Sequence, residues 1–276
     1  DREMIAEADR LIFVHIPKSG GTTLRRLLSE QFCGTGVAHV NRADIQQMPT
    51  PCSPSASLVM GHMPFGLHER LPGKSMYLTM LREPTARAIS QYHAWLRRRE
   101  LDIEQFSFDE FLVSTPKLNN DQTRVVLGNV ERHVPLTNAD LDQAKENLEN
   151  RFLFAGVTER FDESVILLAQ KLGWGKPPRY VPSNQTVRPL TPRDLSPSAL
   201  RLIRERNELD YALHRHAEVL LEKEIQAVGK AFISQQLRIY QSQKRWKLLS
   251  DYGKRVVRHF VPQSLQNMIR DFNGNK

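Results

Sequence analysis

Apolar residues gather along the chain in two kinds of pattern, which predict two kinds of element. Four short continuous runs rich in strand-forming residues predict buried strands at residues 11–16, 58–61, 76–81 and 152–157. Apolar residues that recur every three or four positions predict helices at residues 84–99, 106–114, 120–128, 141–149, 161–172 and 198–224. Strands that alternate with helices indicate an α/β fold, with a central parallel sheet covered by helices on both faces. Ligands of such sheets bind at the carboxyl ends of the strands.

The first strand runs directly into the segment PKSGGTT, whose composition suits an anion. Helical spacing then begins, at Leu24, Leu27, Leu28 and Phe32. Two adjacent glycines, Gly20 and Gly21, allow a tight turn and a close approach of the backbone to a ligand. The uncapped N–H groups and the dipole of the new helix favour an oxyanion there. Lys18 adds a positive charge, and Thr22 and Thr23 add hydroxyl donors, so the segment predicts a phosphate cradle. An ordinary turn between strand and helix is the alternative.

The order of residues in this cradle argues against the two commonest nucleotide-binding loops. A nucleoside triphosphatase loop reads GxxxxGK[ST], with the lysine after the glycines, whereas Lys18 comes before them. The GxGxxG turn of dinucleotide-binding domains is also absent.

A second junction between a strand and a helix repeats the theme. Arg82 follows the strand at residues 76–81, and Pro84 suits the first turn of the helix that comes next. The guanidinium of Arg82 can hold two phosphate oxygens at once. Ser90 lies two turns into this helix, on a face with Arg87 and Gln91, and can donate to the same anion. Two such junctions in one sheet predict a ligand with two separated phosphate groups.

Taken together, these segments resemble a known family. HIPKSGGTT and LREPTARAISQYH are similar to the paired 5′-phosphosulfate and 3′-phosphate motifs of the carbohydrate O-sulfotransferases that use 3′-phosphoadenosine 5′-phosphosulfate, PAPS. The closest resemblance is to the heparan sulfate 6-O-sulfotransferases and their bacterial relatives. It extends over residues 11–224 through NNDQTRVVLG, LDQAKENLENRFLFAGVTERFDES and SNQTVRP.

The resemblance implies a P-loop-like three-layer fold and PAPS as the sulfuryl donor, with no metal. It assigns the 5′-phosphosulfate to Lys18, Ser19, Gly20, Gly21, Thr22 and Thr23. It assigns the 3′-phosphate to Arg82 and Ser90, with Thr186 and Arg188 as further contacts in a loop that closes over the cofactor. Ser19 stands where relatives commonly have Thr, and this change keeps a hydroxyl.

Transfer of a sulfuryl group to an alcohol needs a base for the hydroxyl proton and a cation near the oxygen that leaves. Histidine suits the role of base. His62 directly follows the strand at residues 58–61, and the resemblance places the base there, with Lys18 at the leaving oxygen. The alternatives are a His62 that only closes a turn, and a base elsewhere, at His15, His68 or His93. His93 shares a helix face with Tyr92, which favours a place in the core.

The resemblance implies a carbohydrate acceptor, poly- or oligosaccharide. Asn120, Gln122 and Arg124 lie in one of the resembling segments and are candidates to bind it, with Arg124 meeting a carboxylate or a sulfate. The apolar residues beside them equally permit a purely structural helix. A phosphotransferase is a weaker alternative, because no Asp suited to Mg²⁺ follows a strand. A third is a protein that binds PAPS or an acidic polymer without turnover.

Charge divides the chain into two parts, which we predict to be a sulfotransferase domain at residues 1–224 and a basic helical extension at residues 225–276. The extension holds ten Lys and Arg against two Asp, whereas residues 1–224 hold 29 of each sign. Its apolar residues form two stripes separated by Pro262. It either packs on the main domain or a second subunit, or holds an acidic polymer or a membrane surface. Nucleic acid is not expected, because no recognition motif is present.

The sequence contains no apolar run of the roughly 18 residues that span a bilayer, and no signal peptide at its start. We therefore expect a cytoplasmic protein if it is bacterial, or one of the Golgi lumen if it is a trimmed eukaryotic enzyme. Cys33 and Cys52 are too few for a disulfide framework, and they predict two thiols or a single bridge.

Overall fold

The computed structural model has a parallel sheet of five strands at its centre, and it describes residues 10–41, 44–45, 56–115, 118–129, 131, 133–178, 180 and 190–242. The strands are β1 (Arg10–Val14), β2 (Val37–His39), β3 (Leu58–Gly61), β4 (Ser75–Leu81) and β5 (Phe152–Val157), in the order β2-β3-β1-β4-β5. Every residue of β1, β3 and β5 is buried, which is why these strands read as continuous apolar runs.

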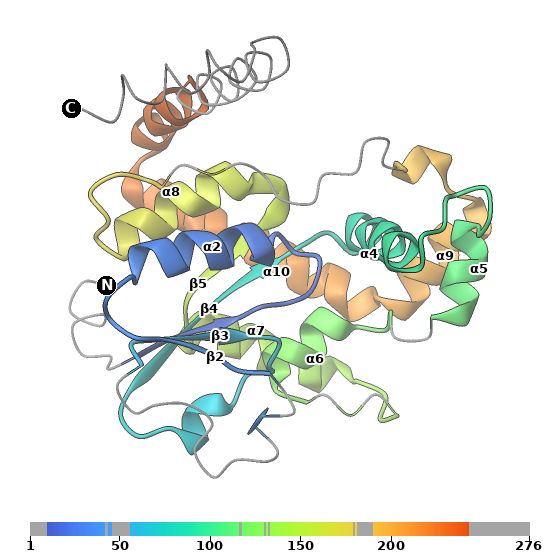
Figure 1. The fold of residues 1–276 in the computed structure, drawn as a ribbon, viewed down its shortest axis with the longest axis horizontal. Helices are drawn as coiled ribbons and strands as arrows, with labels where there is room; N and C mark the ends of the chain where they lie inside the picture. Colours follow the sequence, from blue (N-terminus) through green and yellow to red (C-terminus); the bar gives the residue numbers. More distant parts are fainter. Residues whose placement is uncertain are drawn as a thin grey trace, which may run out of the picture.

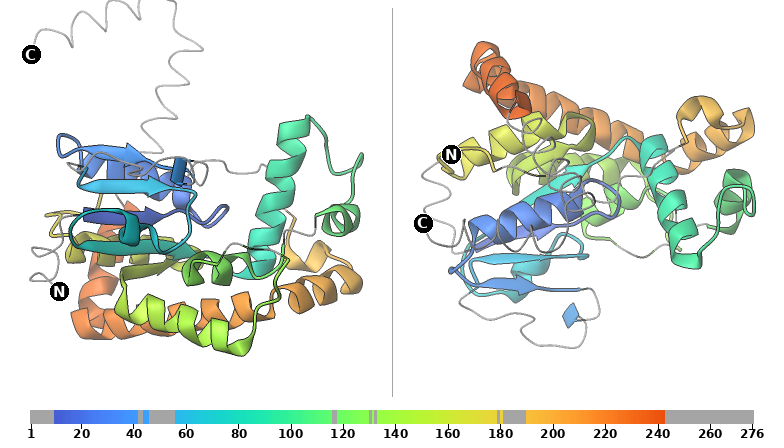
Figure 2. Two further views of the ribbon diagram at one scale, coloured as in Figure 1. Left: turned by 90° about the horizontal axis from the view of Figure 1, so that it is seen from below. Right: turned by 45° about the horizontal axis from the view of Figure 1, so that its top comes forward.

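Helices flank the sheet, as Figures 1 and 2 show. α2 (Gly21–Gln31) follows β1, and its N-cap Gly20 lies against Phe161 at the start of α8 (Phe161–Lys171). α6 (Asp121–Leu127) packs on α7 (Asn138–Asn150), and the long α10 (Glu208–Val228) runs along α7 and the edge strand β5. The predicted α/β fold with a central parallel sheet is thereby confirmed.

Three further helices form a separate lobe beside the sheet, on the right in Figure 1. They are α4 (Pro84–Arg99), α5 (Phe108–Ser114) and α9 (Pro197–Arg206). The lobe has its own hydrophobic cluster, in which Tyr92 and Phe111 are fully buried, while the main cluster surrounds the sheet. The structure thus has two packed bodies, with α4 leading from the sheet into the second.

Two sequence predictions about elements were wrong. The helix predicted at residues 198–224 is two helices, because the chain breaks at Asn207, whose side chain donates to the carbonyl of Ile203. Strand β2 was missed, since it has three residues and none of them is buried. The other predicted elements lie within a few residues of the observed ones. Most of the loop predicted at residues 48–57 lies outside the described residues.

In the described part of the predicted extension, α10 ends at Val228, Gly229 breaks the helix, and residues 230–242 are helical again. Ile233 and Tyr240 belong to the main hydrophobic cluster, and the hydroxyl of Tyr240 donates to the carbonyl of Pro178 at 2.7 Å. Residues 225–242 therefore pack on the sheet body. Residues 243–276, with most of the basic charge, lie outside the described part.

Within the part of the chain that the structure describes, no helix is both long and apolar enough to cross a membrane. Cys33 is an exposed thiol, and Cys52 lies outside the described residues.

Candidate active site

The turn between β1 and α2 is built around two residues with left-handed backbone conformation. Lys18 has a φ of 69° and Gly20 a φ of 72°. Gly20 is the N-cap of α2, and no side chain caps the first N–H groups of this helix. A Cβ on Gly20 would lie 2.9 Å from the Phe161 ring, and one on Gly21 only 1.9 Å from the ring of His15. Glycine is therefore required at both positions, and the helix presents uncapped donors to the adjoining space.

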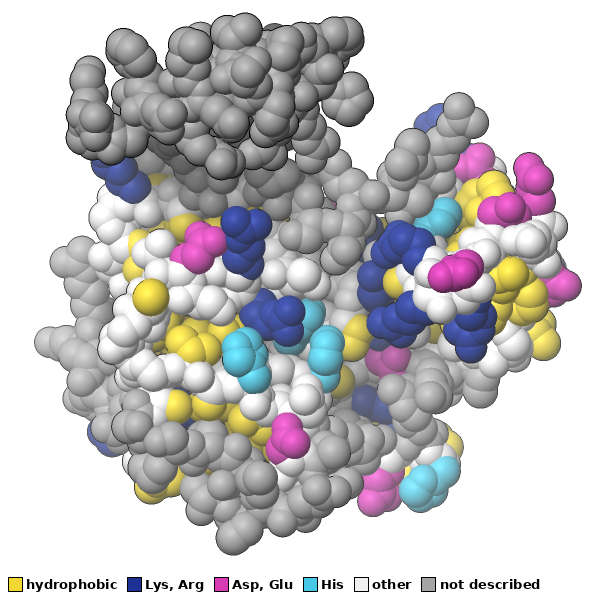
Figure 3. All heavy atoms as spheres, viewed as in Figure 1, with side chains coloured by type: hydrophobic (Ala, Val, Ile, Leu, Met, Phe, Trp, Pro, Cys, Tyr) yellow, Lys and Arg dark blue, Asp and Glu magenta, His cyan; other side chains and the backbone are white. Residues whose placement is uncertain are grey.

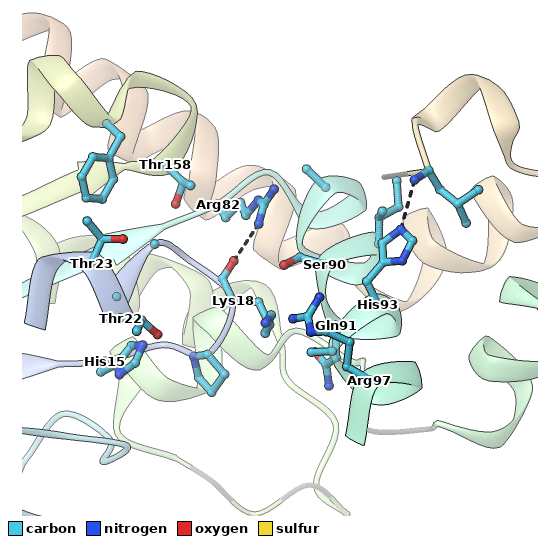
Figure 4. Close-up of a pocket in the computed structure, with 18 of the residues that line it drawn as sticks. His15, Lys18, Thr22, Thr23, Arg82, Ser90, Gln91, His93, Arg97 and Thr158 are labelled. Carbon is cyan, nitrogen blue, oxygen red and sulfur yellow. Dashed lines mark hydrogen bonds between the residues drawn. The ribbon is translucent and has the colours of Figure 1, made fainter. Parts of the chain in front are cut away.

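This space is a cavity of about 1250 Å³ between the carboxyl edge of the sheet and the α4 lobe. Lys18, Gly20, Gly21, Thr22 and Thr23 line it from the predicted cradle, and Arg82 and Ser90 line it from the second junction. The structure thus brings together seven residues that the sequence assigned to two anion sites. Figure 4 shows Lys18, Arg82 and Ser90 around one space.

Arg82 connects the two junctions directly. Its Nη1 donates to the carbonyl oxygen of Lys18 at 3.1 Å, and its Nε lies 3.9 Å from a carboxylate oxygen of Glu159. Nε is buried and has no hydrogen-bond partner among the described residues. Burial lowers the pKa of Arg82, and the carboxylates of Glu159 and Glu83 oppose this effect. A half-buried guanidinium in the cavity wall suits an anionic ligand.

Ser19 lies behind the cradle and not in the cavity wall. Its side chain is fully buried, and its hydroxyl donates to Oε1 of Gln122 at 3.4 Å. The same Oε1 accepts the backbone N–H of Arg82 at 2.9 Å, and Nε2 of Gln122 donates to the Arg82 carbonyl at 2.8 Å. Gln122 therefore ties both junctions together.

The other two residues predicted to bind the acceptor are buried as well. Oδ1 of Asn120 accepts the backbone N–H groups of Leu209 and Asp210. Arg124 donates to the carbonyls of Glu131 and Val134. The structure places Asn120, Gln122 and Arg124 behind the wall of the cavity, where they hold the surrounding segments in place.

A buried ion pair braces the cradle from α4. Nη2 of Arg87 lies 3.0 Å from Asp121 of α6, and its Nε donates to the carbonyl of Pro17 at 3.3 Å. Nη1 lies 3.9 Å from Asp210, which also accepts the backbone N–H groups of Gln122 and Thr123. The sequence analysis did not identify this role, because it depends on three helices far apart along the chain.

Two histidines stack at the cavity wall beside the cradle. The rings of His15 and His62 are stacked, with centroids 4.4 Å apart and planes inclined by 28°, and Nδ1 of His62 lies 3.0 Å from the carbonyl oxygen of His15. A carbonyl only accepts, so this bond places the proton on Nδ1 and leaves the lone pair on Nε2. His62 is exposed, whereas His15 is buried. Burial, followed by the charges of His62, Arg25 and Lys18, lowers the pKa of His15 to about 3, which keeps it neutral.

The remaining rival histidines are held by other groups. Nδ1 of His68 lies 2.9 Å from the hydroxyl of Tyr77, and His68 is not in the cavity wall. His93 is in the wall, although it is buried, and its Nε2 accepts the backbone N–H of Leu190 at 3.0 Å.

The wall contains residues that the sequence analysis did not single out as part of the site. Thr158, Phe161 and Tyr180 line one side, and Arg97 and Arg98 extend it along α4. Figure 3 shows Lys and Arg side chains on both sides of the hollow, with histidines next to those on its left side. Burial, then the charges of Arg97, Arg98 and Arg82, lowers the pKa of Lys18. Thr186 and Arg188 lie outside the described residues.

Comparison with known proteins identifies the family. The model of the Sulfotransferase family matches residues 1–216. The chain belongs to this family. The cavity that both anion-suited junctions line is its candidate active site. Within the described residues of this sulfotransferase, no group of three or more His, Cys, Asp or Glu side chains is arranged to hold a metal ion.

Two solved sulfotransferase structures match the chain at low identity and with TM-scores below 0.5. One, from Alicyclobacillus acidocaldarius, is 16% identical with a TM-score of 0.42, covering 77% of this chain and 95% of its own. The other, a mouse sulfotransferase complexed with PAP, is 15% identical with a TM-score of 0.40, covering 78% of this chain and 94% of its own. A search of curated proteins found no match.

Proposed function

We propose that this sulfotransferase moves the sulfuryl group of PAPS to a hydroxyl group of a carbohydrate. The observation that carries the proposal is the pair of anion-suited junctions in one cavity, joined by the hydrogen bond from Arg82 to the Lys18 carbonyl. PAPS has two phosphate centres, one of which bears the sulfuryl group. The carbohydrate acceptor rests on the resemblance of the sequence segments to carbohydrate O-sulfotransferases.

The residues present fit such a donor. The uncapped N–H groups at the start of α2, with Lys18 and Thr22, would hold the 5′-phosphosulfate. Arg82, whose half-buried guanidinium is in the cavity wall, would hold the 3′-phosphate together with Ser90. When bound, the donor supplies an activated sulfuryl group whose leaving oxygen becomes negatively charged.

His62 is the proposed general base. The hydrogen bond between its Nδ1 and the His15 carbonyl leaves Nε2 free to take a proton. In the proposed transfer, the acceptor hydroxyl gives its proton to this Nε2 as its oxygen bonds to sulfur. Lys18, on the cradle, counters the charge of the oxygen that leaves. His15 lies beneath His62 and fixes its orientation without adding a second positive charge.

The proposal is tested by donor binding and by transfer. Titration with 3′-phosphoadenosine 5′-phosphate, PAP, should give saturable binding that Lys18→Met and Arg82→Met each weaken by about tenfold or more, since each removes a charge-assisted contact. Arg26→Met is the matched control, because Arg26 is exposed on α2 and pairs only with Glu30 among the described residues. Circular dichroism confirms that each variant is folded.

Transfer is measured with sulfur-labelled PAPS and a panel of poly- and oligosaccharides. Label should appear in a carbohydrate product and should depend on His62. Binding of PAP with no labelled product from any acceptor would instead identify a binding protein without turnover. Binding of ATP in preference to PAP would favour a phosphotransferase.

A further inference from the structure

A helix at residues 230–242 lies beyond residues 1–216, the part of the chain that the family model matches. Two of its side chains, Ile233 and Tyr240, are buried in the main hydrophobic cluster. Burial of an apolar side chain is sufficient to explain Ile233. Tyr240 also makes polar and aromatic contacts with the segment that carries Tyr180 of the cavity wall, and these contacts need a second explanation.

Tyr240 contacts this segment at two points. Its hydroxyl donates to the carbonyl oxygen of Pro178 at 2.7 Å, and its ring centroid lies 6.1 Å from that of Tyr180, with the planes inclined by 42°. Burial, followed by the charge of Asp162, raises the pKa of Tyr240, so its hydroxyl stays protonated as a donor. Tyr240 itself is not in the cavity wall. It therefore supports Tyr180 from outside the cavity.

Tyr180 connects this support to the cradle. It lines the cavity, its hydroxyl donates to a carboxylate oxygen of Asp162, and its ring meets that of Phe161 edge-on, with centroids 4.9 Å apart. Phe161 also lines the cavity, and a Cβ on Gly20, the N-cap of α2, would lie 2.9 Å from its ring. A continuous row of packed side chains thus leads from Tyr240 to the start of the cradle helix.

The place of Tyr180 in the chain makes these contacts important. Phe161 and Asp162 begin α8, whereas Tyr180 lies in neither a helix nor a strand. The position of its ring therefore depends on its side-chain neighbours, among them Phe161 and Asp162 of α8 and Tyr240 of the helix at residues 230–242.

We propose that Tyr240 is a positioning residue of the donor site: it holds Tyr180 in the cavity wall, so that the wall beside the cradle is formed before the donor binds. This inference rests on the proposed function, which puts the 5′-phosphosulfate of PAPS on the cradle. A wall that is already ordered loses less conformational entropy when the donor binds, and this raises affinity. The part of the chain that serves the donor then extends to residue 240, beyond the domain boundary expected at residue 224.

The test uses the full chain and measures PAP binding by calorimetry and transfer from labelled PAPS. Tyr240→Ala removes the ring and the hydrogen bond, Tyr240→Leu keeps a larger apolar side chain in the buried position, and Tyr240→Phe keeps the ring. Ile233→Ala is the control, because it shortens a buried side chain of the same helix about two turns before Tyr240. Urea unfolding gives the stability of each variant.

Tyr240→Ala and Tyr240→Leu should each raise the Kd for PAP and the KM for PAPS by about fivefold or more, and Tyr240→Phe should restore both to within about threefold of the wild type. Ile233→Ala should lose stability and keep its Kd for PAP within about threefold. Tyr180→Ala should weaken PAP binding too, and the double variant with Tyr240→Ala should bind no more weakly than Tyr180→Ala, because Tyr240 acts through Tyr180.

Unchanged PAP affinity in the folded Tyr240→Ala and Tyr240→Leu variants would overturn the inference, and so would additive losses in the double variant or an equal loss of affinity in Ile233→Ala. If Tyr240→Ala does not fold, Tyr240→Leu decides. Failure of the proposed function is recognised in the wild type. A wild type that binds PAP but transfers no label would overturn the proposed transfer and leave this inference to the Kd values of the variants, whereas a wild type that does not bind PAP would overturn both.

Discussion

At the scale of single residues, the site depends on a hydrogen bond that determines which ring nitrogen of His62 carries the proton. The proton of His62 is placed by a backbone carbonyl, which stays in place whatever side chain residue 15 carries. His15 instead acts through its ring, which lies between His62 and the tightly packed Gly21. One histidine is thus held ready to accept a proton, and the other is kept neutral.

Replacing His62 should remove turnover and leave donor binding intact. For His62→Gln we expect kcat to fall by about 10²-fold or more, because general-base assistance is lost, while the Kd for PAP changes little. Single-turnover transfer from labelled PAPS and PAP calorimetry measure the two quantities. His68→Gln is the control, since His68 lies in the same segment outside the cavity wall. Near-normal turnover in His62→Gln would exclude it as the base.

The pKa of His15 makes a prediction about stability against pH. The unfolded chain takes up a proton near the ordinary value of 6.5, whereas the folded protein does so only near 3. This contribution is therefore fully present above pH 6.5 and is lost as the pH falls toward 3. By pH 4 the loss in the free energy of unfolding amounts to about 3 kcal/mol. Urea unfolding from pH 4 to 8 should show a weaker pH dependence in His15→Asn than in the wild type, and identical slopes would contradict the assignment.

At the scale of elements, the cradle is held by close contacts and by side chains that lie behind it. The turn from β1 into α2 has no room for a Cβ at Gly21, and Gln122 of α6 links it to the start of α4. The elements that carry the two anion-suited junctions are thereby fixed relative to each other.

Gly21→Ala tests the close contact. Its Cβ would meet the His15 ring at 1.9 Å, so that ring must move and displace His62. We expect a loss of about 1–3 kcal/mol in the free energy of unfolding and a lower kcat. Gly175→Ala is the control, because nothing lies within 4 Å of a Cβ there. Chemical denaturation and transfer assays on both variants measure the difference, and equal behaviour would show that His15 adapts without cost.

Gln122→Met tests the tie between the junctions. The substitution preserves volume but leaves the backbone N–H and carbonyl of Arg82 without their partner. We expect a loss of about 1–3 kcal/mol in stability and weaker PAP binding. Gln143→Met, at an exposed position of α7, is the control. Unchanged PAP affinity in a destabilised Gln122→Met would limit its role to folding.

At the scale of the whole molecule, the cavity lies where two packed bodies meet. The cradle belongs to the sheet body, while Ser90, Arg97 and Arg98 belong to the α4 lobe with its own hydrophobic cluster. The basic extension remains a prediction beyond residue 242, as do its partners, an acidic polymer, a membrane surface or a second subunit.

A ligand that contacts both the sheet body and the α4 lobe should slow the exchange of backbone amide hydrogens in both. In hydrogen exchange, PAP should slow the amides of the first turn of α2 and those of α4 together. Adenosine 5′-phosphosulfate lacks the 3′-phosphate, so it should protect the cradle and leave α4 nearly unchanged. If PAP slows amide exchange only in the cradle and not in α4, Arg82 and Ser90 do not belong to the donor site.

The sequence by itself determined the parallel sheet, the cradle and the position of Arg82 and Ser90, because strand burial and the turn from strand to helix are encoded in neighbouring residues. Only the tertiary structure decided which polar side chains face the cavity. Gln122 and Arg124 read as binding residues, yet the packing of α6 buries them, and Arg97, which the sequence analysis did not single out, is exposed and lines the cavity. Helical spacing alone does not specify which neighbour a face meets, and that choice depends on contacts between segments far apart along the chain.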